Sequence, residues 1–287
     1  MLYANSLFRI GDERRAYRVL SCGTELGFDE SDPAHKRLVH ANFCRERLCP
    51  MCAWRRSLKC FHQVSQVMDV IQKEHPHLVP VFVTFTVRNC DAEAFKLTLD
   101  MIFKAWSAMM VKDRKMKRIV VGWFRALETT YNMRDDTYHP HIHAIMLVDQ
   151  GYFRSKDYLR TQDWVQLWRK ACKLSYDPIC DARRVNTQDG AKKAVSEVAK
   201  YTVKDTDYLK DDEELTDRLV HTFGNVLAHR RLTAFGGVMK EVNNRLKLGD
   251  PFEGDLVNVD GQELREDVVK MITVYRWHVG FRNYVRD

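Results

Sequence analysis

The spacing of hydrophobic residues predicts helices and strands in alternation along the chain. Apolar residues recur at steps of three and four over residues 54–71, 92–110 and 158–173, which is the period of an amphipathic helix. The same spacing predicts helices over residues 191–204 and 213–231. No internal repeat is visible, so the pattern does not indicate a solenoid or a propeller.

Short runs of β-branched and aromatic residues predict the strands. Residues 79–87 form one run, and residues 119–131 and 142–148 form two more, whose polar connection predicts an antiparallel hairpin. Residues 181–186 and 268–284 add shorter strands. This order predicts an α+β fold, an antiparallel sheet covered by helices.

The chain is expected to have three parts. The first 62 residues show little periodic hydrophobicity, so we expect a small irregular module there. With its connecting helix, this Cys-rich module takes residues 1–75. The core of the fold takes residues 76–210, and a C-terminal helix and strands take residues 211–287.

The composition is that of a globular protein. Of the 287 residues, 45% are hydrophobic and 30% are charged, which excludes collagen-like, coiled-coil and low-complexity chains. No apolar stretch approaches the length of about 18 residues that a helix needs to cross a bilayer. The first residues also lack the apolar segment of a signal peptide. We therefore expect a cytoplasmic protein whose cysteines are reduced, so a tight cysteine cluster favours metal binding over cross-linking.

Positive charge is unevenly distributed. The net charge is only +7, but residues 36–59 hold seven Lys and Arg against one acid, and residues 112–118 hold five against one. Such runs are either solvated helix faces or contacts for nucleic acid.

A cysteine cluster near the N-terminus has the spacing of a zinc site. Cys44, Cys49 and Cys52 lie within nine residues, and the C-x-x-C half lets two sulfurs reach one tetrahedral ion. Cys22 is the best fourth ligand because the following glycine eases a tight turn. The alternatives for this position are His40, Cys60 and His62.

A second candidate metal site lies on the predicted hairpin. On a strand, His141 and His143 point to the same face, so that both imidazoles can reach one divalent ion. Glu128 is the only carboxylate on the preceding strand, and the hairpin can bring it beside the pair. His139 shares the parity of the two histidines, but Pro140 predicts that it lies in a loop.

The helix after residue 190 carries a polar stripe. Glu197, Tyr201, Lys204 and Tyr208 follow one another at steps of four, three and four, which stacks them on one face. A carboxylate, a phenol and an ammonium group are therefore available together, although such a stripe is often only a solvated face.

These motifs, in this order, resemble those of HUH endonucleases, specifically the rolling-circle plasmid replication initiators (Rep proteins). The motifs are Phe82-Val-Thr84-Phe-Thr86, His141-Ile-His143, Glu197-Val-Ala-Lys200-Tyr201 with Lys204, and Cys49-Pro-Met-Cys52-Ala-Trp-Arg-Arg. The resemblance extends from about Cys22 to Gly237. It departs from the family pattern at Phe85, where leucine is expected, and this change affects packing rather than chemistry.

The resemblance implies the roles of individual residues. Residues 76–210 would form the nicking domain, with Mn²⁺ or Mg²⁺ held by His141, His143 and Glu128. Tyr201 would attack a phosphate to give a 5′-phosphotyrosine and a free 3′-OH. Lys204 would neutralise charge, and Glu197 would activate water at termination, with Tyr208 a less favoured second nucleophile.

The resemblance also implies partners. The Cys-rich module would bind Zn²⁺, and the C-terminal part would complete the sheet or contact DNA. Origin DNA would be a stem-loop with a single-stranded nick site, and without a P-loop motif the chain would need a host helicase and polymerase. Monomer and homodimer both remain open, and no membrane partner is expected. Predicted DNA contacts are Arg45, Arg47, Arg55, Arg56 and Lys200, with the region of His229-Arg230-Arg231 as a further candidate for reading the origin.

Three alternatives compete with this interpretation. A single-tyrosine transposase or a relaxase belongs to the same superfamily, but the former lacks the cysteine module and the latter carries a third metal-binding histidine. A non-catalytic, zinc-containing DNA-binding regulator would leave the histidines and Tyr201 unexplained. A hydrolase with catalytic zinc on the histidines would form no covalent adduct with DNA.

Overall fold

A computed structural model describes residues 2–31, 36–185, 188–199, 203–250, 252–259 and 272–286. The chain divides into two compact units, and both are discontinuous in sequence. Unit 1 contains residues 1–62, 205–228 and 253–287, and unit 2 contains residues 63–204 and 229–252. The three-part division predicted from the sequence, with boundaries after residues 75 and 210, is a division by function and stays a prediction.

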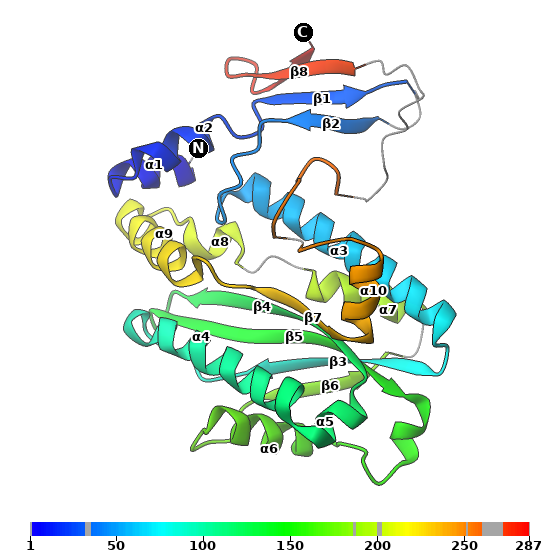
Figure 1. Cartoon of the computed structure of the whole chain (residues 1–287). Coiled ribbons are helices and arrows are strands. Elements are labelled where there is room, and N and C mark those ends of the chain that lie inside the picture. Colours follow the sequence, from blue (N-terminus) through cyan, green and yellow to red (C-terminus); the bar gives the residue numbers. More distant parts are fainter. Residues whose placement is uncertain are drawn as a thin grey trace. The chain divides into compact units, whose positions relative to one another are not determined.

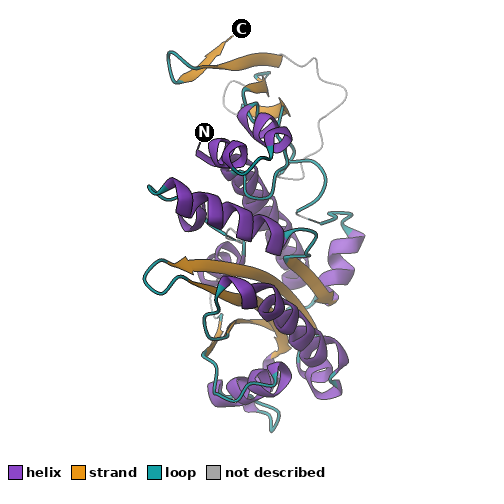
Figure 2. Cartoon of the chain, turned by 90° about the vertical axis from the view of Figure 1, so that its left-hand side faces the viewer, coloured by secondary structure: helices purple, strands orange, loops and turns teal. Residues whose placement is uncertain are grey.

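Unit 2 is built on a five-stranded antiparallel sheet (Figure 1). The strand order is β6-β3-β5-β4-β7, so the predicted hairpin of β4 and β5 lies next to β3. The bounds are β3 (Leu78–Thr86), β4 (Gly122–Asn132), β5 (Thr137–Asp149), β6 (Cys180–Arg184) and β7 (Thr233–Gly237). Figure 2 shows the long, twisted strands in orange with helices beside them.

Unit 2 contains the helices α4 (Ala92–Trp106), α5 (Arg114–Ile119), α6 (Thr161–Cys172), α7 (Gln188–Val198) and α10 (Val238–Arg245), with a π-helix at η1 (Ser107–Lys112) and a 3-10 helix at η2 (Gln150–Arg154). Three of these helices match those predicted over residues 92–110, 158–173 and 191–204, and α5 and α10 were not predicted. Helix α3 (Pro50–Glu74) contains the change from unit 1 to unit 2.

The two faces of the sheet differ in chemistry. Phe85 in β3 contacts the rings of Trp106 in α4 and of Trp164 and Trp168 in α6, so these helices bury one face. Because side chains alternate along a strand, Thr84 points to the other face. Helix α7 contacts β5, and the histidine pair lies on the face to which Thr84 points.

The prediction that His139 lies in a loop is wrong, since β5 already begins at Thr137. Tyr138 exchanges both backbone hydrogen bonds with Cys90, and by alternation the missing N–H of Pro140 faces the same side. The last residue pair between β3 and β5 is Thr86 with His141, so no residue of β3 is paired with Pro140. A proline is therefore tolerated in a central strand because the strand on that side has ended.

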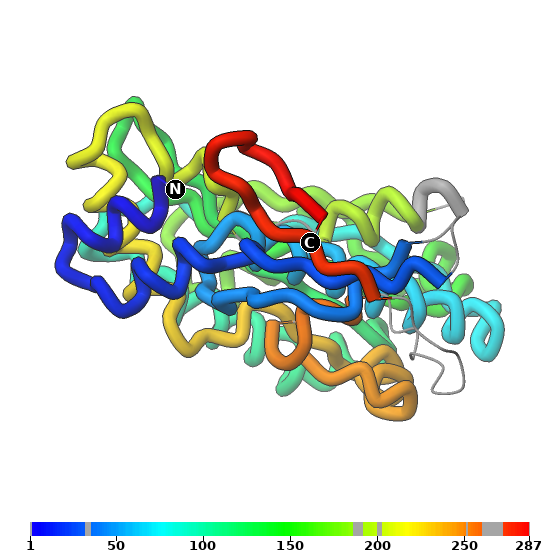
Figure 3. The backbone as a smooth tube through the Cα atoms, turned by 90° about the horizontal axis from the view of Figure 1, so that it is seen from above, coloured from blue at the N-terminus to red at the C-terminus, as the bar shows by residue number. Residues whose placement is uncertain are grey.

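Unit 1 combines helices with a four-stranded antiparallel sheet of order β2-β1-β8-β9. The strands are β1 (Glu25–Asp29), β2 (Arg37–Ala41), β8 (Ile272–His278) and β9 (Asn283–Arg286), and the helices are α1 (Leu2–Arg9), α2 (Glu13–Leu20), α8 (Asp205–Tyr208) and α9 (Glu213–Leu227), with the start of α3. Figure 3 shows the C-terminal hairpin in red beside the blue N-terminal segment.

The expectation of an irregular N-terminal module is wrong in its local structure. Residues 2–41 contain α1, α2, β1 and β2, which are short and mostly polar, so they show little hydrophobic period. Their burial comes from distant residues. Tyr3 lies edge-on to Tyr208, and Tyr208 lies edge-on to Phe223, so α1, α8 and α9 share one apolar cluster.

The α+β fold with an antiparallel sheet flanked by helices is confirmed. Among the residues that the structure describes, no helix is long and apolar enough to span a membrane.

Candidate metal centres

Strands β4 and β5 bring a carboxylate and two imidazoles together in unit 2. Glu128 is paired directly with His141 across the hairpin, and His143 lies two residues farther along β5. The Glu128 Oε2 atom lies 2.9 Å from His143 Nε2 and 3.5 Å from His141 Nε2. All three ligand atoms lie within 4.8 Å of one another, and Glu128 and His143 are buried. This geometry suits one divalent ion.

The electrostatics of this group favour a cation. Burial alone raises the pKa of Glu128, but hydrogen bonds with His141 and His143 hold it well below its ordinary value. The carboxylate therefore stays ionised and faces two imidazole nitrogens. One carboxylate oxygen and two neutral imidazoles form a donor set that Mn²⁺, Mg²⁺ and Zn²⁺ can all use.

Two further contacts orient the imidazoles. Thr84 Oγ1 lies 3.1 Å from His143 Nδ1, because β3 pairs with β5 in a register that sets Thr84 opposite His143. The backbone carbonyl of His139 lies 3.2 Å from His141 Nδ1. Both Nδ1 atoms are thus engaged, which directs both Nε2 atoms toward Glu128. The sequence pattern placed Thr84 on a strand but missed its contact with His143, which depends on the register between β3 and β5.

One residue of the predicted polar stripe contacts the group directly, and another is linked to it through intervening side chains. Lys204 Nζ lies 3.9 Å from Glu128 Oε1. Glu197 in α7 accepts a hydrogen bond of 2.8 Å from Arg183 in β6, and the Arg183 guanidinium lies over the Phe82 ring. Phe82 in turn lies 5.6 Å from the His143 ring, measured between centroids. Lys204 therefore lies beside the carboxylate of the group, whereas Glu197 is linked to the histidine pair through Arg183 and Phe82.

The predicted continuous helix from residue 191 to Tyr208 is wrong. Helix α7 ends at Val198, and Val203 and Lys204 are not helical before α8 begins at Asp205. Tyr201 and Lys200 lie outside the described residues. Tyr208 is buried in unit 1, where its hydroxyl donates to the carbonyl of Leu48, so it is not available as a nucleophile in this structure.

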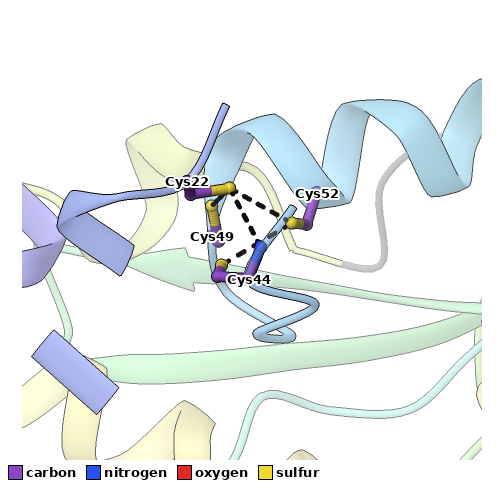
Figure 4. A group of neighbouring side chains, drawn as sticks. All are labelled: Cys22, Cys44, Cys49 and Cys52. Atoms are coloured by element: carbon purple, nitrogen blue, oxygen red, sulfur yellow. Dashed lines mark hydrogen bonds between the residues drawn. The ribbon is translucent and has the colours of Figure 1, made fainter. Parts of the chain in front are cut away.

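Four thiols form a second group, in unit 1 (Figure 4). Cys22 Sγ lies 3.5 Å from Cys52 Sγ and 3.6 Å from Cys49 Sγ, and Cys44 Sγ lies 3.6 Å from Cys52 Sγ. Four thiolates around a tetrahedral Zn²⁺ lie about 3.8 Å apart, whereas a disulfide needs about 2.05 Å. The spacing thus fits a metal rather than cross-links.

The surroundings of the thiols favour a bound cation. Hydrogen bonds with Cys22 hold the pKa of Cys49 well below, and those of Cys44 and Cys52 well above, the ordinary thiol value. The backbone N–H groups of Cys44, Arg45 and Glu46 donate to sulfur atoms, as they do around thiolates.

Cys22 completes this group, and the alternatives do not. Gly23 has a φ of +68°, a left-handed conformation that suits glycine and turns the chain directly after Cys22. Cys60 is buried outside the group, and His40 contacts Glu25.

The four arginines near the thiols have different environments. Arg55 and Arg56 are 8% and 6% exposed. Arg55 donates to the carbonyls of Leu256 and Val257, and Arg56 donates to the carbonyls of Arg45 and Glu46. Their guanidinium groups are thus used within unit 1. Arg45 is exposed and Arg47 is half-buried, so both remain candidates for contacting DNA.

The region of His229-Arg230-Arg231 lies in unit 2. Arg230 is held by Asp100 at 2.6 Å, and Arg231, which is largely exposed, lies 3.4 Å from Asp250.

An antiparallel sheet with a histidine pair on its central strand and a glutamate on the adjoining strand is consistent with the HUH class of proteins. The model of the replication protein family matches residues 35–285. The chain belongs to the replication protein family, and the predicted resemblance to plasmid rolling-circle initiators is confirmed.

Several relatives are similar over nearly the whole chain. "Protein rep" of Bacillus amyloliquefaciens is 35% identical over 95% of this chain and 85% of its own length. "Protein rep" of a Bacillus species is 36% identical over 95% and 94%, and that of Streptococcus pneumoniae is 34% identical over 93% and 82%. No solved structure matches the chain significantly.

Proposed function

We propose that this replication protein is a metal-dependent nickase that starts rolling-circle replication of a plasmid in the cytoplasm. The observation that carries the proposal is the group of Glu128, His141 and His143 on paired strands, with Lys204 beside it. Nicking of a single strand at the origin provides a 3′-OH primer.

The site residues divide the work. Mn²⁺ or Mg²⁺ held by Glu128, His141 and His143 would supply Lewis-acid stabilisation at a phosphate. Tyr201 forms a bond from its oxygen to the scissile phosphorus as the bond to the 3′ oxygen breaks. The phenol loses its proton, and the leaving oxygen gains one, so a 5′-phosphotyrosine and a 3′-OH result. Lys204 offsets negative charge beside Glu128.

Termination requires a second cleavage without a second tyrosine. Glu197 takes a proton from water, which attacks the second phosphodiester and leaves a 5′-phosphate and a free 3′-OH. That 3′-OH attacks the phosphotyrosine, and the Tyr201 oxygen leaves and regains a proton as the strand is rejoined. The ion pair with Arg183 supports this role because it holds the Glu197 carboxylate in one orientation. Tyr208 is buried, which also favours Glu197-activated water over a second tyrosine nucleophile at termination.

The thiol group has a structural role in this proposal. A Zn²⁺ ion bound by Cys22, Cys44, Cys49 and Cys52 would stabilise unit 1, and all four protein ligands leave no open position for chemistry. Arg45, Arg47 and Lys200 contact the DNA backbone. A host helicase separates the strands, and a host polymerase extends the primer. The nicking domain corresponds to residues 76–210.

The decisive experiment detects the covalent intermediate. The chain is incubated with Mn²⁺ and single-stranded stem-loop oligonucleotides that tile its plasmid, then denatured, and its intact mass is measured. We expect an adduct that peptide mapping assigns to Tyr201 and that is absent in Tyr201→Phe. Glu197→Gln should still form the adduct but lose the second, hydrolytic cleavage.

Tyr158→Phe is the matched control, since it removes an exposed tyrosine hydroxyl from the same unit and should leave the adduct unchanged. If the wild type forms no adduct with any oligonucleotide while Mn²⁺ is bound, the nickase proposal fails.

A further inference from the structure

The C-terminal hairpin of β8 and β9 extends beyond the sheet of unit 1. Strand β1 pairs with β8 only as far as Arg276, and β8 and β9 continue to pair up to His278 with Asn283. The turn between them closes with a hydrogen bond from Arg282 N–H to Val279 O. The tip is therefore a two-stranded ribbon with no third strand beside it among the described residues.

The tip combines exposed apolar groups with positive charge. Val279 and Phe281 are 66% and 71% exposed, although apolar side chains of this size are usually buried in a monomer. Arg282 and Arg286 are exposed along the same hairpin, Arg276 is exposed and lies 3.4 Å from Glu25 of β1, and residues 272–286 contain no Asp or Glu. This charge is complementary to a polyanion.

The ribbon is fastened beside the thiol group. The Tyr284 hydroxyl donates to the carbonyl of Gly23 at 2.5 Å, and the N–H of Trp277 donates to the carbonyl of Thr24 at 2.8 Å. Gly23 directly follows Cys22, a member of the thiol group. The Trp277 ring packs edge-on against Tyr284, which stiffens the two strands against each other. A metal bound to the thiols would thus fix the base of the ribbon.

We propose that the β8–β9 hairpin is a ribbon that binds duplex DNA of the origin in its major groove. The major groove admits a two-stranded β-ribbon, with arginines positioned for phosphates and base edges and with apolar tips in contact with thymine methyl groups. This inference rests on the proposed function because it assigns the ribbon's duplex to the origin. A duplex contact complements the nicking site, which needs an unpaired strand.

The test uses two substitutions in the full-length chain, each with a matched control. Arg282 has a φ of +48°, so Arg282→Asn removes the charge with a residue that tolerates this conformation. Its control is Arg14→Asn, an exposed arginine of α2 in the same unit. Phe281→Ala is matched by Leu97→Ala, because both side chains are 71% exposed.

Binding is measured by fluorescence anisotropy with labelled duplexes that tile the plasmid, at several salt concentrations. For Arg282→Asn we expect about tenfold weaker duplex binding and a salt slope smaller by about 1. For Phe281→Ala we expect about fivefold less discrimination between the origin and unrelated duplexes. The controls should bind like the wild type, and zinc content and thermal melting should be unchanged in all four variants.

Three results overturn the inference: unchanged duplex binding, an equal loss for single-stranded oligonucleotides, or a change in oligomeric state by light scattering with DNA affinity retained. The last result would assign the hairpin to contacts between copies. The covalent adduct on short single strands is measured in parallel. If the wild type forms no adduct, the nickase proposal fails. If the wild type forms the adduct but the hairpin variants bind duplex DNA as well as the wild type, only the ribbon proposal fails.

Discussion

At the residue scale, the sequence predicted that Glu128, His141 and His143 come together, but it did not predict the contacts that orient them. Glu128, His141 and His143 follow from strand parity and from the single carboxylate on the preceding strand, which are local features. Thr84 contacts His143 only because β3 pairs with β5 in one particular register. That register depends on residues far apart in the chain, so the spacing of side chains did not reveal it.

The contact between Thr84 and His143 predicts a positioning role that can be measured without DNA. When Nε2 binds a metal ion, Nδ1–H donates to Thr84 Oγ1, which fixes the ring and its tautomer. Thr84→Val should weaken Mn²⁺ binding about tenfold in calorimetry, and Thr84→Ser should restore it. Thr86→Val, which removes a hydrogen bond to Ile179 instead, is the control. Equal Mn²⁺ affinity in the Val and Ser variants at position 84 would exclude this role.

At the scale of elements, long periodic segments were predicted and short polar ones were not. Helix α3 and strand β3 match their predicted positions because each buries a continuous apolar pattern. Helices α1 and α2 were missed because eight-residue helices are stabilised by distant partners such as Tyr208 rather than by their own pattern. The stripe from Glu197 to Tyr208 was read as one helix because periodicity alone does not show where a helix ends.

Strand β3 separates packing from chemistry by alternation, which can be tested at Phe85. Its ring contacts three tryptophans on the face opposite His143, so Phe85→Leu leaves a small cavity there. We expect a loss of about 1–2 kcal/mol in the free energy of unfolding, measured with urea, and an unchanged Mn²⁺ affinity. A Mn²⁺ affinity that falls with stability would show that the two faces are not independent.

At the scale of the whole molecule, the sequence predicted the fold class but not the discontinuous units. The order of elements along the chain is a local property, whereas unit 1 gathers both ends of the chain and a middle segment. Strand β8 pairs with β1 although most of the chain separates them. Only the complete set of contacts shows that the cysteines and the C-terminal hairpin belong together.

Removal of metal from the thiols should affect the two units differently. Binding of structural zinc is coupled to folding, so chelation should lower the melting temperature of unit 1 by at least about 10 °C. The Mn²⁺ affinity of unit 2 should stay within about twofold. Elemental analysis should find one zinc per chain in the wild type and in Cys60→Ser, and none in Cys49→Ser. A tenfold loss of Mn²⁺ affinity on chelation would contradict this separation.

The pairing of β1 with β8 has a consequence for protein synthesis. The ribosome releases β1 and β2 early, but their sheet gains β8 and β9 only after the long segment that separates β2 from β8 has been made. Nascent chains and prematurely terminated chains therefore lack the hairpin that rests against Gly23. Folding of unit 1 is therefore delayed until the long segment between β2 and β8 has been synthesised.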